Sequence, residues 1–211
     1  SCLDLGKKVH EKSNIPVEVA IRYQFPSIKE SLLNLKNKGC EEIFVVPLYP
    51  HYAMSTTLTT ENEVKRINED SNFRLNLTFI GAFYKEDQYI QSLCNVIKNN
   101  RQEESDFLLF SYHGIPNRHL VKTDPTESHC LKVKNCCDLD SDAKPYCYKA
   151  QVIETSNLCA NKLGLKRNEW SISFQSRIGP GWLTPFTDKR LAKLPEEGKD
   201  NIAILCPIIY I

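Results

Sequence analysis

An apolar run passes directly into a turn in Asp106-Phe107-Leu108-Leu109-Phe110-Ser111-Tyr112-His113-Gly114-Ile115-Pro116. The run as far as Tyr112 predicts a buried strand, and Gly114 and Pro116 predict a tight turn after it. His113 therefore stands at the rim of the predicted sheet. Because an imidazole can both bind a divalent metal and take up a proton near neutral pH, His113 is a candidate catalytic residue. The alternative is a histidine that only satisfies backbone groups at a strand end.

Strand and helix patterns alternate on both sides of this run. The predicted strands are 17–21, 42–48, 75–80, 106–112, 170–175 and 201–206, and the predicted helices are 27–38, 57–68, 86–98, 148–163 and 188–194. Alternation with nearly continuous apolar strands is typical of an α/β fold, with parallel sheets covered by helices on both faces. Functional sites in such folds gather beyond the carboxyl ends of the strands. The periodicity stops between Gly114 and Pro145, which predicts a long irregular segment.

The composition is that of an ordinary globular protein. Of the 211 residues 41% are hydrophobic, and 27 basic residues nearly balance 26 acidic ones to give a net charge of +1. With no basic tract, nucleic acid is not an expected partner. No apolar run reaches the ~18–20 residues of a membrane span, and Ser1–Lys8 is unlike a signal peptide, so we expect a cytoplasmic location. The lack of an initial methionine indicates a chain that begins partway through a longer protein or has been processed.

A second segment that follows a predicted strand is rich in aromatic and hydroxyl side chains. Residues 46–57 read V-P-L-Y-P-H-Y-A-M-S-T-T. Flat aromatic faces next to polar groups suit the wall of a ligand site that holds carboxylates. Two plainer readings remain open: Ser55 or Thr56 caps the helix that follows, and His51 is a solvent-facing loop residue.

A third segment of this kind combines a cation with a large aromatic side chain. Residues 174–183 read F-Q-S-R-I-G-P-G-W-L and follow the predicted strand 170–175. Arg177 and Trp182 suit a large anionic and aromatic ligand. The alternative for Trp182 is a place in the core.

Four motifs in the chain resemble the ferrochelatase family, in the family's order. Ala20–Ile28 is similar to A-M-R-Y-G-x-P-S-I, and Pro47–Thr57 is similar to P-L-Y-P-Q-Y-S-x-S-T. Phe110–Pro116 matches F-S-x-H-G-I/L-P, and Gln175–Leu183 is similar to Q-S-R-x-G-x-x-x-W-L. Each motif alone is modest, but four of them spread over most of the chain are jointly specific.

The resemblance implies both a fold and an activity. The fold is a chelatase-like pair of Rossmann-like lobes with helices on both faces, an incomplete first lobe at 1–100 and a second lobe at 101–211. The activity is insertion of Fe²⁺ into a porphyrin, protoporphyrin IX or coproporphyrin III, to form haem, with peripheral membrane contact as one route for this substrate. His113 matches the family's catalytic histidine and would be the base or the iron ligand. The porphyrin cleft would be lined by Arg22, Tyr23, Tyr49, Tyr52, Ser55, Thr56, Arg177 and Trp182.

The chain also departs from the family pattern. The family's catalytic glutamate lies in a D-x-x-E-T segment after a C-P strand end, whereas this sequence stops at Cys206–Ile211. The opening strand region of the family is absent as well, so we expect a fragment that lacks both termini. The spacing to Trp182 is one residue shorter than usual. The alternative function is therefore an inactive or non-catalytic homologue that binds a tetrapyrrole or an iron–sulfur cluster. The sequence does not indicate an oligomeric state.

Four of the nine cysteines fall in one polar insertion, residues 124–147. Cys130, Cys136, Cys137 and Cys147 are spaced C-x5-C-C-x9-C, which lacks the paired C-x2-C spacing usual for zinc. Four thiolates from an irregular loop can hold an iron–sulfur cluster instead. The pattern is similar to an internal cysteine insertion in some bacterial ferrochelatases, and that resemblance implies a 2Fe-2S cluster, as a structural staple or a sensor. Zinc with His129, or four reduced thiols in a mobile loop, are the alternatives.

Overall fold

The computed structural model describes residues 1–101 and 107–207. The chain packs as two compact units, one formed by 1–47 and 55–81 and the other by 48–54 and 82–211. This division differs from the lobes predicted at 1–100 and 101–211, because 48–54 and 82–100 pack with the second unit. The two-lobe boundary itself remains a prediction. Among the described residues, none of the helices has the length and apolar character needed to traverse a bilayer.

The first unit is a two-stranded parallel sheet with helices packed against it. Its elements are α1 Cys2–Ser13, α2 Ile28–Asn37, β1 Glu42–Val45, η1 Met54–Leu58, α3 Thr59–Asp70 and β2 Asn76–Phe79. The register of β1 and β2 runs from Glu42↔Asn76 to Val45↔Phe79. Ile28 and Leu32 of α2 and Val64 of α3 pack with Ile43 of β1 in one core.

The opposite face of this sheet carries exposed apolar side chains. Phe44, which points away from Ile43, is 64% exposed, and Val46 beyond it is also exposed. Within the described residues the first unit therefore shows helix cover on one face, and the prediction of helices on both faces is confirmed only in the second unit.

The strand predicted at 17–21 is wrong. These residues are extended but belong to no sheet in the described structure. The carbonyl of Val19 accepts a hydrogen bond from the Ser31 hydroxyl at 2.9 Å, and the Val19 side chain lies directly against Gly6 of α1. The β-branched residues thus pack against two helices, and that contact replaces the strand ladder which their alternation predicted.

The prediction that Ser55 or Thr56 caps the next helix is also wrong. Both residues lie inside the π-helical turn η1, and the residue before α3 is Leu58, whose side chain makes no cap hydrogen bond. The helical backbone therefore continues backward through this segment, and α3 begins two residues later than predicted. Thr59 donates from its hydroxyl to the Ser55 carbonyl at 3.0 Å.

The second unit contains a three-stranded parallel sheet in the order β4-β3-β5. Its strands are β3 Phe107–His113, β4 Trp170–Gln175 and β5 Ile202–Leu205, and its helices are α4 Asp87–Asn100, α5 Asn117–Thr123, η2 Lys144–Tyr146, α6 Tyr148–Lys162, α7 Thr187–Lys193 and η3 Pro195–Glu197. The central strand β3 is buried over six of its seven residues, as its apolar run predicted. The predicted start of this strand at Asp106 lies outside the described residues.

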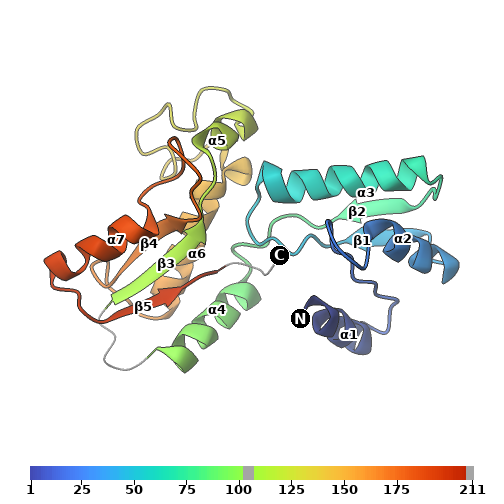
Figure 1. The fold of residues 1–211 in the computed structure, drawn as a ribbon, viewed down its shortest axis with the longest axis horizontal. Helices are drawn as coiled ribbons and strands as arrows, with labels where there is room; N and C mark the ends of the chain where they lie inside the picture. The colour runs from blue at the N-terminus through green and yellow to red at the C-terminus, as the bar shows by residue number, and fades with distance from the viewer. Residues whose placement is uncertain (102–106, 208–211) are drawn as a thin grey trace. The chain divides into compact units, whose positions relative to one another are not determined.

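Helices cover both faces of the second sheet (Figure 1). Leu108, Phe110 and Tyr112 point to the core shared with Cys94 of α4 and Cys159 of α6. On the other face Phe107 and Leu109 pack with Leu194, beside α7. Alternate residues of one strand thus bury themselves against opposite helix layers, which explains why the strand reads as a continuous apolar run. Two helices, α1 and α5, were not predicted.

Candidate active site

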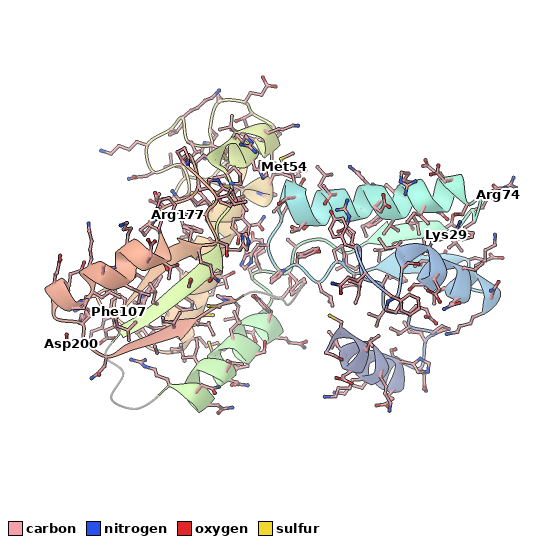
Figure 2. All side chains as sticks on the ribbon, in the orientation of Figure 1. Lys29, Met54, Arg74, Phe107, Arg177 and Asp200 are labelled. Carbon is pink, nitrogen blue, oxygen red and sulfur yellow. The ribbon has the colours of Figure 1, made fainter. Side chains whose placement is uncertain are left out.

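The carboxyl ends of β3 and β4 lie side by side and carry the first candidate residue. His113 ends β3, and its ladder partner Gln175 ends β4. The backbone N–H of Gly114 donates to the Gln175 carbonyl at 2.8 Å, which extends the pairing into the turn. The His113 side chain is exposed at this edge, as the sequence predicted. Figure 2 shows the labelled Arg177 at this end of the sheet, and Phe107 and Asp200 at the other end.

A hydrogen bond fixes which nitrogen of His113 is available. Nδ1 lies 2.7 Å from the carbonyl oxygen of Gly114. A carbonyl oxygen only accepts, so Nδ1 carries a proton, and in the neutral tautomer with this proton the lone pair lies on Nε2. A neutral imidazole with a free Nε2 has the form needed to bind a metal ion or to accept a proton.

The His113 turn packs closely against the loop that follows β4. A Cβ atom added to Gly114 would lie 2.9 Å from the Gln175 carbonyl oxygen and 3.5 Å from the Trp182 ring, so this close approach requires glycine. The backbone N–H of Leu183 donates to the Ile115 carbonyl at 3.1 Å, and Pro116 pairs with Trp182. Trp182 is half-buried beside Gly114 and Pro116 of this turn and does not lie deep in the core.

Arg177 follows β4 and is held toward α7. Its guanidinium lies 4.2 Å from the centre of the Phe186 ring and 3.2 Å from the Asp188 carboxylate. Both members of the ion pair are substantially exposed, so the pair contributes little to stability. The Arg177 guanidinium can therefore leave Asp188 and bind another anion.

The segment 48–54 belongs to the second unit and carries Tyr49 and Tyr52. Both tyrosines are half-buried, and the Tyr52 ring meets Tyr146 edge-on at 5.7 Å. His51 between them is buried: its Nε2 lies 2.9 Å from the Thr155 hydroxyl. Burial lowers the pKa of His51 to about 3. The reading of His51 as a solvent-facing loop residue is therefore wrong.

Four predicted cleft residues lie in the first unit, namely Arg22, Tyr23, Ser55 and Thr56. The guanidinium of Arg22 stacks over the Tyr23 ring at 4.8 Å. Arg22 Nη1 is buried without a hydrogen-bond partner among the described residues, whereas Tyr23 is 78% exposed. A cation with an unused donor beside an exposed aromatic ring has the chemistry that an anionic aromatic ligand requires.

The four cysteines of the insertion gather near the start of α6. Cys130 and Cys147 are buried, and Cys136 and Cys137 are half-buried. The adjacent thiol of Cys137 lowers the pKa of Cys147 to about 6, although burial opposes this shift. The neighbouring Cys147 sulfur correspondingly raises the pKa of Cys137, and burial together with Cys147 raises that of Cys130.

The thiols of this set lie close to one another near the start of α6. Within 1–101 and 107–207, no three His, Cys, Asp or Glu side chains are arranged to hold one metal ion. His129 is also engaged, because its Nε2 lies 2.8 Å from the Cys136 carbonyl oxygen. The sulfurs of Cys130, Cys137 and Cys147 adjoin one another. Thiolates are the donors that either an iron–sulfur cluster or a zinc ion requires.

Sequence reasoning missed the polar residues of α6 that support the site. Tyr148 donates from its hydroxyl to the His113 carbonyl at 2.9 Å, and Gln151 accepts from the Tyr52 backbone N–H at 2.7 Å. The sequence carries one signal, the i, i+4 spacing of Gln151 and Thr155, which places both on one face of the helix predicted at 148–163 but does not show what that face contacts.

Comparisons with known proteins agree on one family. A family model described as "Ferrochelatase" matches residues 2–208. The "Ferrochelatase" proteins of Stutzerimonas stutzeri (strain A1501) and Pseudomonas fluorescens (strain Pf0-1) are each 41% identical over 194 residues, covering 91% of this chain and 57% of the relative. The chain thus spans little more than half the length of these relatives. The solved structure "SirB from Bacillus subtilis with Fe3+" is similar in fold, with a TM-score of 0.61 and 14% identity over 99% of this chain and 72% of that one.

Proposed function

This chain belongs to the ferrochelatase family, and from that premise we propose that its protein inserts Fe²⁺ into a porphyrin, protoporphyrin IX or coproporphyrin III, to form haem. The observation that carries the proposal is the exposed His113 at the end of β3, with Nδ1 bonded to the Gly114 carbonyl and Nε2 without a partner among residues 1–101 and 107–207. A cytoplasmic location and peripheral membrane contact remain predictions.

The reaction requires both a proton acceptor and a metal donor. Two pyrrole N–H protons must leave the porphyrin as Fe²⁺ exchanges its waters for four ring nitrogens. The Nε2 lone pair of His113 suits either task, because it can accept one proton at a time or bind the iron before transfer. The carbonyl of Gly114 stabilises the imidazolium that proton uptake creates, since Nδ1–H already points at it.

Binding contacts would hold the porphyrin in a conformation that exposes its nitrogens. Arg22 and Arg177 are the proposed partners of the propionates, and Trp182 and Tyr52 offer aromatic faces to the macrocycle. Tyr23, Tyr49, Ser55 and Thr56 complete the proposed lining. Contacts remote from the metal can supply the energy that distorts the ring toward the transition state.

A 2Fe-2S cluster held by Cys130, Cys136, Cys137 and Cys147 is the second part of the proposal. The support is the gathering of these sulfurs at the start of α6 and the pKa of about 6 for Cys147, which favours the thiolate that ligation needs. When bound, such a group supplies a covalent tie between the four points of the insertion and a one-electron redox centre.

The catalytic assignment of His113 is tested by measuring iron insertion with the protein as its gene encodes it. His113→Ala should lower kcat by about 10²–10⁴-fold while porphyrin binding, followed by fluorescence, is retained. The matched control is His10→Ala, because His10 lies exposed on α1 of the first unit. Retained activity in His113→Ala would contradict the assignment. A wild-type protein that binds porphyrin but inserts no iron would establish the non-catalytic alternative.

Cluster content is tested separately from activity. Anaerobically purified protein should contain iron and sulfide in equal amounts and absorb in the visible range, and Cys136→Ser should abolish both. Cys40→Ser is the control, because Cys40 is half-buried in the first unit. Colourless anaerobic protein would rule the cluster out.

A further inference from the structure

The residues between the last cysteine of the insertion and the first turn of α6 are hydrogen-bonded to the candidate active site. Cys147 is the N-cap residue of α6, and its carbonyl accepts from the Gln151 N–H at 3.1 Å. Tyr148 is the first helical residue. Any change in how the Cys147 sulfur is held therefore acts directly on the turn that carries Tyr148 and Gln151.

Tyr148 reaches from this turn to the end of β3. Its hydroxyl donates to the carbonyl oxygen of His113 at 2.9 Å, and its side chain is buried. The contact fixes the peptide that joins His113 to Gly114, and the next carbonyl along the chain is the one that orients the imidazole.

Gln151 connects the same turn to the segment that carries Tyr52. Its Nε2 donates to the Pro145 carbonyl at 2.7 Å, and its Oε1 accepts from the Tyr52 backbone N–H at 2.7 Å. The side chain is 1% exposed, so losing either bond would leave a buried polar group unpaired. Because a carbonyl only accepts and an N–H only donates, the amide can satisfy both partners in one orientation only.

A third contact ties this region to the helix that follows the His113 turn. The Thr123 hydroxyl, at the end of α5, lies 3.1 Å from the Tyr146 carbonyl oxygen and shares its one proton between this carbonyl and that of His119 at 3.0 Å. The carbonyls of Pro145 and Tyr146 and the side chain of Tyr148 thus connect the end of the cysteine insertion to Gln151, α5 and His113. The four-residue stretch 145–148 has little freedom to move without displacing them.

We propose that Tyr148 is a positioning residue for His113, and that it couples the placement of the imidazole to the state of the cysteine insertion, with Gln151 making the parallel connection to Tyr52. The proposal rests on the proposed function in treating His113 as catalytic. Ligation of Cys147, or its loss, is transmitted through the first turn of α6 to the His113 carbonyl, and from there to the orientation of Nε2.

The first test removes a single hydroxyl. Tyr148→Phe should lower kcat for iron insertion about 3- to 10-fold with the KM for porphyrin unchanged, because one hydrogen bond that orients the base is lost. It should also shift the ¹⁵N signals of the His113 imidazole in the resting protein. Tyr112→Phe is the matched control, since it removes a buried hydroxyl that is bonded to Ser156 at 2.8 Å and leaves the His113 carbonyl untouched.

The second test measures the coupling by a double-mutant cycle. Cys147→Ser should shift the His113 imidazole signals in the wild-type background, and this shift should fall at least about threefold in the Tyr148→Phe background. Cys136→Ser, at a half-buried position, replaces Cys147→Ser in the cycle should the latter not fold. Equal shifts in both backgrounds would overturn the coupling. The imidazole spectra are recorded without turnover, so they do not depend on iron insertion. A protein that inserts no iron would refute the proposed function, and the spectra would still test the coupling between Cys147 and His113.

Discussion

The imidazole Nε2 of His51 lies 2.9 Å from the Thr155 hydroxyl, and that hydroxyl donates onward to the Tyr84 carbonyl at 2.8 Å. Since the Thr155 proton is committed to Tyr84, the Thr155 oxygen accepts from His51, and Nε2–H is the donor. The ring is surrounded by Tyr84, Tyr112 and Tyr148 at centroid distances of 5.5 to 6.3 Å. Protonating Nδ1 would therefore bury a second N–H and a positive charge among aromatic rings.

This relationship predicts a pH-dependent stability. Burial lowers the pKa of His51 to about 3 from the ordinary value of 6.5. As the pH falls below 6.5 the unfolded chain binds a proton that the folded chain does not, so stability present above 6.5 is lost at about 1.4 kcal/mol per pH unit. Between pH 6.5 and 4.5 the wild type should lose roughly 2–3 kcal/mol more than His51→Gln, as measured by urea unfolding.

The control for this measurement is Tyr112→Phe. It removes a buried hydroxyl beside the same ring but no group that titrates below pH 7, so the steep acid-side slope should persist. Identical slopes for wild type and His51→Gln would show that the His51 ring is solvated or charged in the folded protein, against the buried arrangement described above.

Gly114 supplies the second prediction. In Gly114→Ala the new Cβ would meet the Gln175 carbonyl oxygen at 2.9 Å, and because that atom belongs to the backbone the turn must move. We expect a loss of about 1–3 kcal/mol in the free energy of unfolding. Iron insertion should fall further than stability alone explains, since the turn that must move includes the Gly114 carbonyl that orients His113. Thermal unfolding and turnover are measured on the same sample.

Gly81→Ala is the matched control for this substitution. A Cβ at Gly81 meets no atom within 4 Å, so the free energy of unfolding should change by less than about 0.5 kcal/mol. Gly114→Ala that is as stable and as active as Gly81→Ala would mean that the His113 turn is looser than its packing against Gln175 indicates.

The elements that the sequence predicted correctly are those whose residue pattern fits only one kind of structure. A six-residue apolar run such as Phe107–Tyr112 can be buried on both faces only as a central strand, and that also placed His113 at the sheet edge. The segment 17–21 has two solutions, a strand or an extended stretch packed on helices, and alternation of side chains does not distinguish them.

The missed helix α1 carries apolar side chains that stay exposed in the described structure, among them Leu3, Leu5 and Val9. α1 has no buried residue, and its signal lies in the capping box between Ser1 and Asp4. The supporting contacts of Tyr148 and Gln151 were beyond sequence reasoning for another reason: each joins residues 35 or 99 positions apart, and only the packing of α6 against the end of β3 brings them together.

Arg22 supplies the third prediction. Its Nη1 is buried without a hydrogen-bond partner among the described residues, so a carboxylate that reaches it gains a charge-assisted bond at little desolvation cost. Arg22→Ala should weaken binding of a dicarboxylate porphyrin by about tenfold, measured by fluorescence titration. The same variant should bind the porphyrin dimethyl ester as the wild type does, because the ester carries no charge to lose.

Arg74→Ala is the control for the loss of a cation. Arg74 is exposed and, within the part of the chain that the structure describes, donates only to the nearby Asn72 side chain at 3.0 Å, so its removal should leave both porphyrins bound as before. An equal loss of affinity for the acid and the ester in Arg22→Ala would assign Arg22 to packing against Tyr23 and remove it from the propionate site.

The fourth prediction concerns the turn that opens the cysteine insertion. The Asp124 carboxylate accepts from the backbone N–H groups of His129 at 2.9 Å and Cys130 at 2.7 Å, and from both the N–H and the hydroxyl of Thr126. Burial alone would raise the pKa of Asp124, but these hydrogen bonds outweigh it and hold the pKa well below its usual range. The contribution of the carboxylate is therefore present above its unfolded pKa near 4 and is lost only as the pH falls below that value.

Asp124→Asn keeps the shape of the side chain but replaces one oxygen with a donor, so either the His129 and Cys130 N–H groups or the Thr126 N–H loses its acceptor. Amide hydrogen exchange should accelerate about tenfold or more at pH 7 at the N–H groups that lose it, while exchange in β3 stays unchanged. Asp140→Asn in the same insertion is the control, because Asp140 is exposed. If both variants exchange alike, Cys130 is held by its own burial and its thiol neighbours, and Asp124 is dispensable for presenting the first cysteine of the set.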